Sequence, residues 1–338
     1  MTELKNKKSE KRLIVVAGGA GFLGSHLCDS LIQSQSSSFS IYVVDNFYTG
    51  SRDNLLMHAA AVKVFEADIT SPTFVTDFCV YLEKNETCQF AGIELYNLAC
   101  PASPVHYQKD PVFTWKTSVL GTLHLLELTT CFPRRRFLQA STSEVYGEPL
   151  MHPQCETHFA HLNTLGPRSC YDVGKAAAET LVQDYAAQHH IHASIARIFN
   201  VYGPRMSPVD GRIISNFCTQ ALHNLPLTIY GTGQQTRSFC YVQDLIGGLV
   251  TLMNHDKPLV VNLGNPTEMT VLEVAEKIRT HKRLSTVPPP LVFNAARIDD
   301  PTRRKPDISL AQQVLHWQPL VSFDVGLDAT MAYFSGIN

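Results

Sequence analysis

The sequence predicts an α/β fold in which a doubly wound parallel sheet carries a smaller C-terminal lobe. A β-rich apolar run at 13–16 leads straight into three glycines and then into a helical pattern. Further apolar runs follow, each with a helical stretch behind it, as a doubly wound sheet requires. The chain of 338 residues is also long for one core, which favours a large domain with an added lobe.

The composition is that of an ordinary globular protein, with 44% hydrophobic and 17% charged residues. The formal net charge of -2 gives no field that would recruit nucleic acid or an anionic membrane. No apolar run approaches the roughly 18 residues of a membrane span, and the charged stretch at 1–11 is not followed by a signal-type apolar region. Nine cysteines without CxxC spacing indicate reduced thiols, so we expect a cytoplasmic protein. The 14 histidines show no metal-ligand spacing, so no metal is expected.

The glycine turn after the first strand has the spacing of a dinucleotide-binding fingerprint. Gly18, Gly21 and Gly24 stand three residues apart in AGGAGFLGSHL. The first glycine permits the tight turn, the second lets a pyrophosphate approach the backbone, and the third lets helix pack on strand. Free N–H groups at the helix N-terminus then face the phosphates. Taken alone, the motif would also suit a glycine-rich turn without a ligand.

The next two apolar runs end in acids, which favours the dinucleotide interpretation. IYVVDNF reaches Asp45 about twenty residues beyond the glycines, where a carboxylate accepts hydrogen bonds from the adenosine ribose. An acid at this point repels a 2′-phosphate, so we expect NAD rather than NADP. VKVFEADIT predicts a third strand that ends at Asp68, within possible reach of the adenine. Strand, glycine turn, helix, strand and acid together predict a Rossmann-type domain.

Polar side chains follow the later strands at the points where these strands end. ELYNLACPA predicts a strand that runs into a loop. The strand at 137–140 leads into Thr142, Ser143 and Glu144, and the run from 192 ends at Asn200. Ligands of open parallel sheets lie beyond the carboxyl ends of the strands, so chemistry is expected here. The helix expected at 114–130 has its apolar face at Val119, Leu123, Leu126 and Leu128.

SCYDVGKAAAET places a phenol and an ammonium on one helix face. Tyr171 and Lys175 stand at i and i+4 among strong helix formers. A fixed positive charge favours the phenolate, so Lys175 is expected to lower the pKa of Tyr171 and make it a general base near neutral pH. A surface helix often carries such a pair without function, but this helix begins near the mouth of the predicted sheet. We therefore expect the pair to face a nicotinamide.

Seven longer segments connect these motifs to a known family. They are NLACPASPVHYQKDP, ASTSEVYGEP, GPRSCYDVGK, ARIFNVYGPRM, DGRIISNF, YGTGQQTRSFCYVQDL and DDPTRRKPDIS. Over nearly all of residues 12–335, the chain resembles extended short-chain dehydrogenases/reductases of the NAD-dependent epimerase/dehydratase family. Among these it is most similar to the UDP-glucuronate decarboxylases (UDP-xylose synthases). It departs from that pattern at Ala17 (usually Thr), Ser118 (Asn), Thr164 (Pro) and Val173 (Glu), and the change at Val173 removes a carboxylate near the two catalytic candidates.

The resemblance implies decarboxylation of UDP-glucuronate to UDP-xylose through a 4-keto intermediate, with NAD+ regenerated. Tyr171 would take the proton of the sugar hydroxyl, Lys175 would hold the nicotinamide ribose, and Thr142 would hydrogen-bond the same hydroxyl. The 4-ketone lies β to the carboxylate, so carbon dioxide leaves readily. Glu144 would guide this loss or the protonation that follows. The predicted catalytic residues are Thr142, Ser143, Glu144, Tyr171, Lys175 and Arg237.

The resemblance also implies the binding residues and the assembly. The predicted NAD-binding residues are Gly18, Gly21, Phe22, Leu23, Gly24, Asp45, Asn46, Thr49, Gly50, Asp68, Ile69, Leu98, Ala99, Tyr171 and Lys175. The predicted residues for the UDP-sugar partner are Pro101, Tyr107, Glu144, Arg168, Asn200, Arg205, Arg212, Tyr230, Gln235, Arg237 and Arg304. Residues 11–199 and 234–265 would form the NAD-binding domain, and residues 200–233 and 266–338 the nucleotide-sugar-binding lobe. Two helices per subunit, containing Val119 to Leu128 and Tyr171 to Tyr185, would form the four-helix bundle of a homodimer.

Three alternatives stay open. A nucleotide-sugar 4,6-dehydratase uses an Asp-Glu pair after its threonine, and Ser143 stands in the place of that aspartate. A 4-epimerase has no need for Glu144. A non-catalytic NAD-binding module would predict a broken Tyr-Lys pair, whereas Tyr171 and Lys175 are both present.

Overall fold

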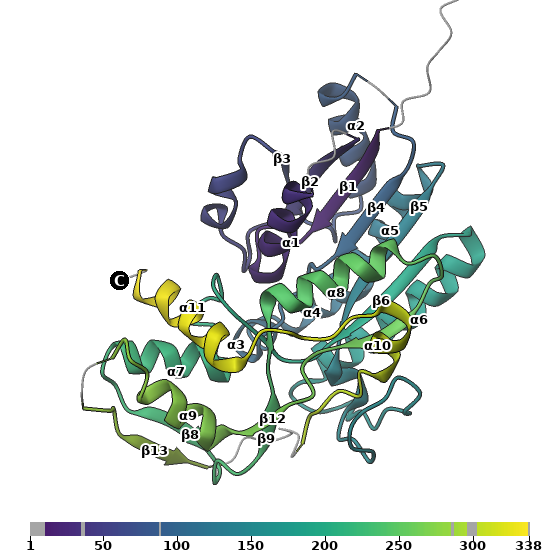
Figure 1. Cartoon of the computed structure of the whole chain (residues 1–338). Helices are drawn as coiled ribbons and strands as arrows, with labels where there is room; N and C mark the ends of the chain where they lie inside the picture. Colours follow the sequence, from purple (N-terminus) through teal and green to yellow (C-terminus); the bar gives the residue numbers. More distant parts are fainter. Residues whose placement is uncertain (1–10, 35–37, 88, 285–286, 296–302, 337–338) are drawn as a thin grey trace, which may run out of the picture.

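A computed structural model describes residues 11–34, 38–87, 89–284, 287–295 and 303–336. Its centre is a seven-stranded sheet in which all neighbouring strands run parallel, in the order β11-β6-β5-β4-β1-β2-β3 (Figure 1). The strands are β1 (Arg12–Ala17), β2 (Phe39–Asp45), β3 (Val62–Glu66), β4 (Ile93–Asn97), β5 (Arg135–Thr142), β6 (His192–Ile198) and β11 (Val260–Leu263). The predicted doubly wound parallel sheet is confirmed. The strand order reverses between β1 and β4, which is where such sheets bind their ligands.

Helices cover both faces of this sheet, and β1 shows why. Ile14 and Val16 point into the core shared with α1 and α8, whereas Leu13 and Val15 point into the core on the opposite face. Side chains buried on both faces explain the unbroken apolar run in the sequence. The first face carries α1 (Phe22–Gln33), α8 (Val242–Asn254) and α10 (Ser309–Leu315), and the second carries α2 (Phe74–Asn85), α5 (Thr122–Thr130) and α6 (Ser169–His189).

The single helix expected at 114–130 is three consecutive pieces. They are α4 (Pro111–Lys116), the π-helical turn η2 (Thr117–Gly121) and α5. A π turn holds more residues than an α turn, so it rotates the faces of the helix that follows. The predicted apolar face was therefore partly wrong: Leu126 and Leu128 are buried as expected, but Leu125 is buried in place of Leu123.

The smaller lobe is built mainly from the C-terminal third and lies beyond the carboxyl ends of the strands (Figure 1). Three two-stranded sheets belong to this end of the molecule, β7 with β10, β9 with β12, and β8 with β13. The elements are β7 (Val201–Tyr202), α7 (Ile213–Leu222), β8 (Leu227–Tyr230), β9 (Thr236–Ser238), β10 (Cys240–Tyr241), β12 (Glu268–Thr270), α9 (Val271–Arg279), β13 (Leu291–Asn294) and α11 (Phe323–Ser335). The short elements η1 (Arg52–His58), α3 (Pro104–Tyr107) and η3 (Ser143–Tyr146) complete the described chain.

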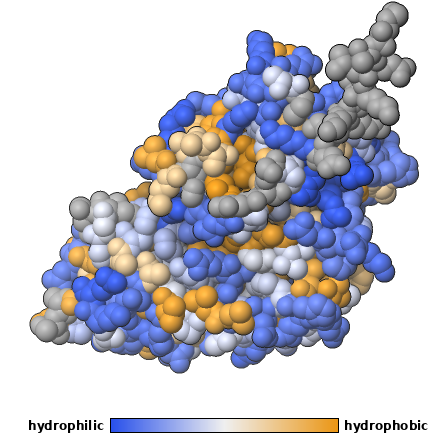
Figure 2. Space-filling model, turned by 45° about the horizontal axis from the view of Figure 1, so that its top comes forward, coloured by the Kyte–Doolittle hydropathy of each residue, from blue (hydrophilic) through white to orange (hydrophobic). Residues whose placement is uncertain are grey.

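The surface is dominated by hydrophilic side chains on the face that Figure 2 shows, with hydrophobic ones in small separate patches. Among the described helices, none combines the length and the apolar character that crossing a bilayer requires.

Candidate active site

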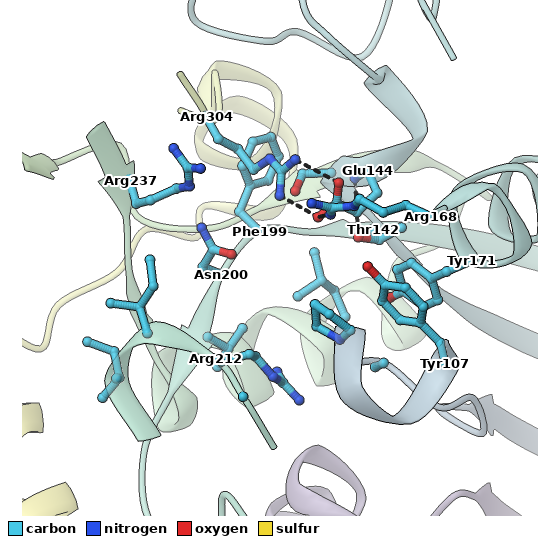
Figure 3. Close-up of a pocket in the computed structure, with 18 of the residues that line it drawn as sticks. Tyr107, Thr142, Glu144, Arg168, Tyr171, Phe199, Asn200, Arg212, Arg237 and Arg304 are labelled. Carbon is cyan, nitrogen blue, oxygen red and sulfur yellow. Dashed lines mark hydrogen bonds and ion pairs between the residues drawn. The ribbon is translucent and has the colours of Figure 1, made fainter. Parts of the chain in front are cut away.

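A cavity of about 770 Å³ opens where the large sheet meets the lobe (Figure 3). Its walls come from the carboxyl ends of β5 and β6, from α3, from the start of α6, and from the lobe. These are the places where the sequence predicts chemistry. The predicted residues that line it are Leu23, Leu98, Tyr107, Thr142, Ser143, Glu144, Arg168, Tyr171, Lys175, Asn200, Arg212, Tyr230, Gln235, Arg237 and Arg304.

Tyr171, Lys175 and Thr142 meet in the buried wall of this cavity. The hydroxyl of Tyr171 shares a hydrogen bond with the side chain of Thr142, whose Oγ1 also accepts the N–H of Glu144 (3.2 Å). The Nζ of Lys175 donates to the carbonyl oxygen of Ala140 (2.8 Å) and lies 5.9 Å from the centre of the Tyr171 ring. The first turn of α6 and the end of β5 therefore hold a phenol, a hydroxyl and an ammonium within one small volume.

The pKa of Tyr171 does not move in the direction that the sequence predicts. Burial raises it above its ordinary value, and the hydrogen bond with Thr142 and the positive charge of Arg212 only partly oppose this. Lys175 was expected to lower the pKa, but its ammonium is hydrogen-bonded to a backbone carbonyl. In the protein alone, Tyr171 is therefore a protonated phenol.

A second tyrosine lies flat against the first. The rings of Tyr107 and Tyr171 are stacked, with centres 5.0 Å apart and planes 7° from parallel (Figure 3). Tyr107 comes from α3 and is 1% exposed. Because the two rings are almost parallel, Tyr107 fixes the orientation of the Tyr171 ring, and its own hydroxyl lies in the same cavity wall.

Glu144 lies between two arginines that come from distant parts of the chain. Arg304 binds both of its carboxylate oxygens, through a short contact to Oε1 and a 2.7 Å bond from its Nη2 to Oε2 (Figure 3). Arg168 reaches Oε1 from the other side at 2.6 Å. Burial alone would raise the pKa of Glu144, but Arg304 and then Arg168 outweigh it and hold the pKa below its usual value. The carboxylate is therefore ionised at neutral pH.

This arrangement changes the roles expected for two arginines. Arg237, predicted as catalytic, is buried and donates to the carbonyl oxygen of Thr236 (2.8 Å), and its effect on Glu144 is weaker than that of Arg304. Arg304, predicted only as a substrate contact, is the bidentate partner of Glu144. The two residues are 160 positions apart in the sequence, so no local pattern could have paired them.

Two predicted substrate residues do not line the cavity. Arg205 forms an ion pair with Asp29 of α1 (2.7 Å), so its guanidinium serves the contact between that helix and the loop after β7. Pro101 is buried, and its neighbours Cys100 and Ala102 face the cavity instead. Arg212 does line the cavity and pairs with Asp210 (3.0 Å).

Several lining residues were not predicted. Cys100 belongs to the NLACPASP motif, and Phe199 stands directly before the predicted Asn200, so both lay next to residues that the sequence did single out. The others also stand in the quoted family segments, but as apolar side chains they gave no indication of a place in the site. They include Val105, Met206, Phe217 and Phe239.

The two departures from the family pattern nearest to the site lie outside the cavity. Val173 is half-buried and does not line the cavity. Ser118 lies against Gly174 of α6, where an added Cβ would come within 3.2 Å of the serine Cβ, and its Oγ is 3.4 Å from the Sγ of Cys100.

The glycine turn has the shape that a pyrophosphate requires. Gly18 has a φ of +76°, and a Cβ there would come within 2.8 Å of the backbone N of Ala99. A Cβ on Gly24 would overlap the carbonyl oxygen of Gly18. No side chain caps the N-terminus of α1 at Gly21, which leaves the N–H groups of its first turn available to a phosphate. A backbone cradle of this kind fits a dinucleotide phosphate.

Asp45 ends β2 beside this cradle, where a ribose would lie. Its carboxylate accepts the N–H of Ala20 (2.9 Å) and of Phe47 (2.8 Å), which fix its orientation. Burial raises the pKa of Asp45, and the two N–H groups oppose that rise. β3 ends at Glu66 rather than at Asp68, where the sequence predicted its end. Beyond the strand, the side chain of Asp68 accepts the N–H of Thr70 (2.8 Å).

The remaining predicted cofactor residues gather around the same groove. A Cβ on Gly50 would come within 3.0 Å of Ala20, which places its loop over the glycine turn. Ile69 is buried against Gly121. The residues at the ends of β2 and β4 and at the start of α1 are Phe22, Asn46, Thr49, Leu98 and Ala99. Within the described residues, no three His, Cys, Asp or Glu side chains are grouped in a way that could hold a metal ion.

Comparison with known proteins gives a consistent result. A family model described as GDP-mannose 4,6 dehydratase matches residues 15–330. UDP-glucuronic acid decarboxylase 1 of Arabidopsis thaliana is 47% identical over 96% of this chain and 70% of its own length, and decarboxylase 6 of the same plant is 46% identical over 96% and 90%. The structure of UDP-glucuronic acid 4-epimerase from Bacillus cereus, in complex with UDP-glucuronic acid and NAD, matches with a TM-score of 0.82 and 28% identity over 96% of this chain and 100% of its own. The chain therefore belongs to the extended short-chain dehydrogenase/reductase family, in its group of UDP-glucuronic acid decarboxylases.

Proposed function

We propose that this protein decarboxylates UDP-glucuronate to UDP-xylose through a 4-keto sugar, with NAD restored at the end of each cycle. The observation that carries the proposal is the ionised Glu144, held by Arg168 and Arg304 in the same cavity wall as Tyr171. The relatives that are named UDP-glucuronic acid decarboxylases support it.

Oxidation at C4 of the sugar comes first. Tyr171 must first lose its own proton to solvent, and its phenolate oxygen then receives the proton of the C4 hydroxyl. Thr142, already hydrogen-bonded to Tyr171, holds the same hydroxyl. Since burial favours the neutral phenol, the hydrogen bond with Thr142 and the positive charge of Arg212 are what this chain supplies to stabilise the phenolate. NAD, when bound, supplies a reversible hydride acceptor.

Loss of carbon dioxide follows from the position of the new ketone. The ketone at C4 is β to the carboxylate on C5, so the electrons of the breaking bond between C5 and C6 flow into the ketone and form an enolate. A proton must then reach C5. Glu144 is the only acid among the described residues that line the cavity, and this excess of positive charge in the lining favours a uronate over a neutral sugar. The basic lining residues are Arg168, Lys175, Arg212, Arg237 and Arg304.

The cofactor and the nucleotide sugar would occupy different parts of the chain. We assign NAD to residues 11–199 and 234–265, where the glycine cradle and Asp45 lie. Residues 200–233 and 266–338 would hold the nucleotide sugar. Asn200, Tyr230 and Arg304 line the cavity from these residues. Gln235 and Arg237 line it from the start of 234–265, with Arg237 as the donor for the diphosphate.

A homodimer is part of the proposal. Val112, Trp115 and Leu120 are large apolar side chains that α4 and η2 leave 65%, 41% and 41% exposed. Their spacing puts them on one side of a continuous helix that packs against α6. A second copy of the chain, whose α4–α5 and α6 pack against the same helices here, would cover these side chains in a four-helix bundle.

We also propose that the protein resides in the cytoplasm, because none of the described cysteines forms a disulfide.

The test is incubation of the full chain with UDP-glucuronate and NAD+, with the sugar product identified by mass spectrometry. The proposal predicts carbon dioxide and a UDP-pentose. A product of unchanged mass would indicate a 4-epimerase. A 4-keto-6-deoxy sugar from UDP-glucose would indicate a dehydratase, which the serine at position 143 argues against. Release of neither product would leave a non-catalytic NAD-binding module and refute the proposal.

A further inference from the structure

Arg304 reaches Glu144 from a segment with almost no regular structure of its own. Residues 304–307, here called the strap, form only an isolated bridge, between Pro306 and Gln154. The strap comes from the C-terminal part of the chain, whereas Glu144 belongs to η3 at the end of β5. Something must fix the distance between them, because a long side chain on an irregular segment loses conformational entropy when it is ordered.

Gln154 ties the strap to the loop that follows η3. Its backbone N–H donates to the carbonyl oxygen of Lys305 (2.9 Å), and its own carbonyl accepts the N–H of Asp307 (2.8 Å). Its side-chain Oε1 accepts the N–H of Lys305 (2.9 Å). Gln154 is 1% exposed, so these bonds are shielded from water.

Asn262, near the end of β11, joins this strap to the turn that carries Glu144. Its Nδ2 donates to the carbonyl oxygens of Gln154 (3.0 Å) and Asp307 (3.1 Å). Its Oδ1 accepts the hydroxyl of Tyr146, two residues after Glu144, at 2.7 Å. One fully buried amide thus contacts both sides of the pair, the strap through its nitrogen and η3 through its oxygen.

The far side of Tyr146 is also fixed. The Nη1 of Arg197 donates to the Tyr146 hydroxyl (3.2 Å), and Arg197 is itself held by the carboxylate of Glu179. Glu179 accepts the hydroxyl of Ser141, next to Thr142 on β5. A chain of buried hydrogen bonds therefore runs from the catalytic strand to the strap through Asn262.

We propose that Asn262 is a positioning residue that sets the spacing between Arg304 and Glu144. Its amide makes all three bonds only when strap and η3 lie at the observed separation, so it selects the arrangement in which the bidentate pair forms. This inference rests on the proposed decarboxylation for its effect on rate, but its structural content stands without substrate.

Three variants of the full chain test it. Asn262→Leu keeps the approximate size and removes all three side-chain bonds. Tyr146→Phe keeps both bonds from Asn262 to the strap side and removes the bond to η3, together with the Arg197 bond to the same hydroxyl. It is the milder change if Asn262→Leu folds poorly. Thr330→Val is the matched control, because it removes one fully buried hydrogen bond, to Gly326 in α11, without any bond to the strap.

The first measurement uses protein without substrate. Besides Arg168 and Arg304, Glu144 faces Arg237 and the phenols of Tyr107 and Tyr171. Its paired carboxylate stabilises the native state above its unfolded pKa, and this contribution is lost as the pH falls through the lower folded pKa. Asn262→Leu and Tyr146→Phe should therefore show a smaller fall in Tm on acidification than the wild type. The Tm of Thr330→Val should fall by the same amount as that of the wild type. Parallel curves for all three variants would overturn the inference.

The second measurement is kinetic. With UDP-glucuronate, we expect kcat of Asn262→Leu to fall by about tenfold to a hundredfold, because a misplacement of about 1 Å has effects of that size. In the Arg304→Ala background, the same change should alter kcat by less than about twofold, because its effect passes through Arg304. Equal effects in both backgrounds would show a merely structural role and overturn the inference. A wild type that releases no carbon dioxide would refute the proposed function instead, and the Tm curves would then decide the role of Asn262.

Discussion

The proposed chemistry of the site depends on one carboxylate, Glu144, that is kept ionised although it is largely buried. Glu144 has 13% of its side chain exposed, and such burial alone favours the neutral acid. Two guanidinium groups reverse that preference, and one of them binds in the bidentate geometry that suits arginine. Beside it, burial keeps Tyr171 protonated. The substrate-free cavity therefore holds a fixed anion and a neutral phenol, and in the proposed reaction the phenol must lose its proton before it can act as the base of the oxidation.

Removing the bidentate partner should destabilise the protein most at neutral pH. Arg304→Ala leaves Glu144 with Arg168 only, and breaking a buried pair costs roughly 3 kcal/mol. The pKa of Glu144 rises in the variant, so the variant loses less stability on acidification than the wild type does. The difference in Tm should therefore narrow below about pH 4.

The control for that experiment is Arg52→Ala, which breaks the exposed pair with Glu66. Both side chains of this pair are about 60% exposed, at 62% and 59%. Such pairs contribute about 0–1 kcal/mol, so the variant should follow the wild type at all pH values. A constant Tm difference for Arg304→Ala across the same range would contradict the assignment of Glu144 as an ionised buried acid.

Single residues of the site could be predicted where a motif held them and not where the fold brought them together. Thr142, Glu144, Tyr171 and Lys175 stand at strand ends or in a helical spacing that the sequence displays. The pairing of Glu144 with Arg304 depends on the conformation of the strap, and an irregular segment of this kind shows no periodic pattern in the sequence. The pKa of Tyr171 depends on burial, and burial at the bottom of a cavity is a property of the assembled fold.

At the level of elements, the turn between β1 and α1 is the most constrained part of the chain. Gly24→Ala would place a methyl group on the carbonyl oxygen of Gly18, and neither backbone can move without displacing the helix from the strand. We expect a loss of about 3 kcal/mol in the free energy of unfolding, together with weaker NAD binding. Urea unfolding and titration with NAD+ measure the two effects.

Gly247→Ala in α8 is the matched control, because a Cβ there meets nothing within 4 Å. Glycine inside a helix is less favourable than alanine, so this variant should be more stable by up to about 1 kcal/mol and should bind NAD normally. Equal stability of the two variants would show that the turn tolerates a side chain, which the close approach at Gly24 excludes.

Strands and helices with a single hydrophobic period could be predicted from the sequence, but the helix that the π turn interrupts could not. β1 and β2 each contain a continuous apolar run because helices cover both faces of the sheet. The region 114–130 has a helical composition throughout, so its residues do not indicate the π turn at Thr117–Gly121. That turn changes which side chains are buried in α5, and this is why the predicted face was partly wrong.

On the scale of the whole molecule, Val112, Trp115 and Leu120 form an exposed apolar stripe on α4 and η2, which the proposed dimer would bury. Trp115→Glu places a charge in the centre of this stripe and should convert the proposed dimer into a monomer. Light scattering at micromolar concentration would then give the chain mass of 37.6 kDa in place of twice that value. Leu225→Glu is the control, since Leu225 is 52% exposed and follows α7 in the lobe. A wild type that is already monomeric would contradict the dimer.

The general plan of the molecule was within reach of the sequence, because repeated strand-and-helix units permit few arrangements. The architecture of a parallel sheet with a C-terminal lobe followed from those units. How the lobe returns to the sheet was not predictable, since it depends on buried amides such as Gln154 and Asn262, which resemble ordinary loop residues in the sequence.

The central claim is that Tyr171 and Glu144 act in successive steps on one sugar, and two isosteric variants test it most directly. Absorbance of reduced nicotinamide and trapped carbon dioxide are followed together after addition of UDP-glucuronate and NAD+. Tyr171→Phe should abolish both signals, because no later step can occur without oxidation. Glu144→Gln should still reduce the cofactor but release little carbon dioxide. Full carbon dioxide release by Tyr171→Phe, or a parallel fall of both signals in Glu144→Gln, would contradict this division of roles.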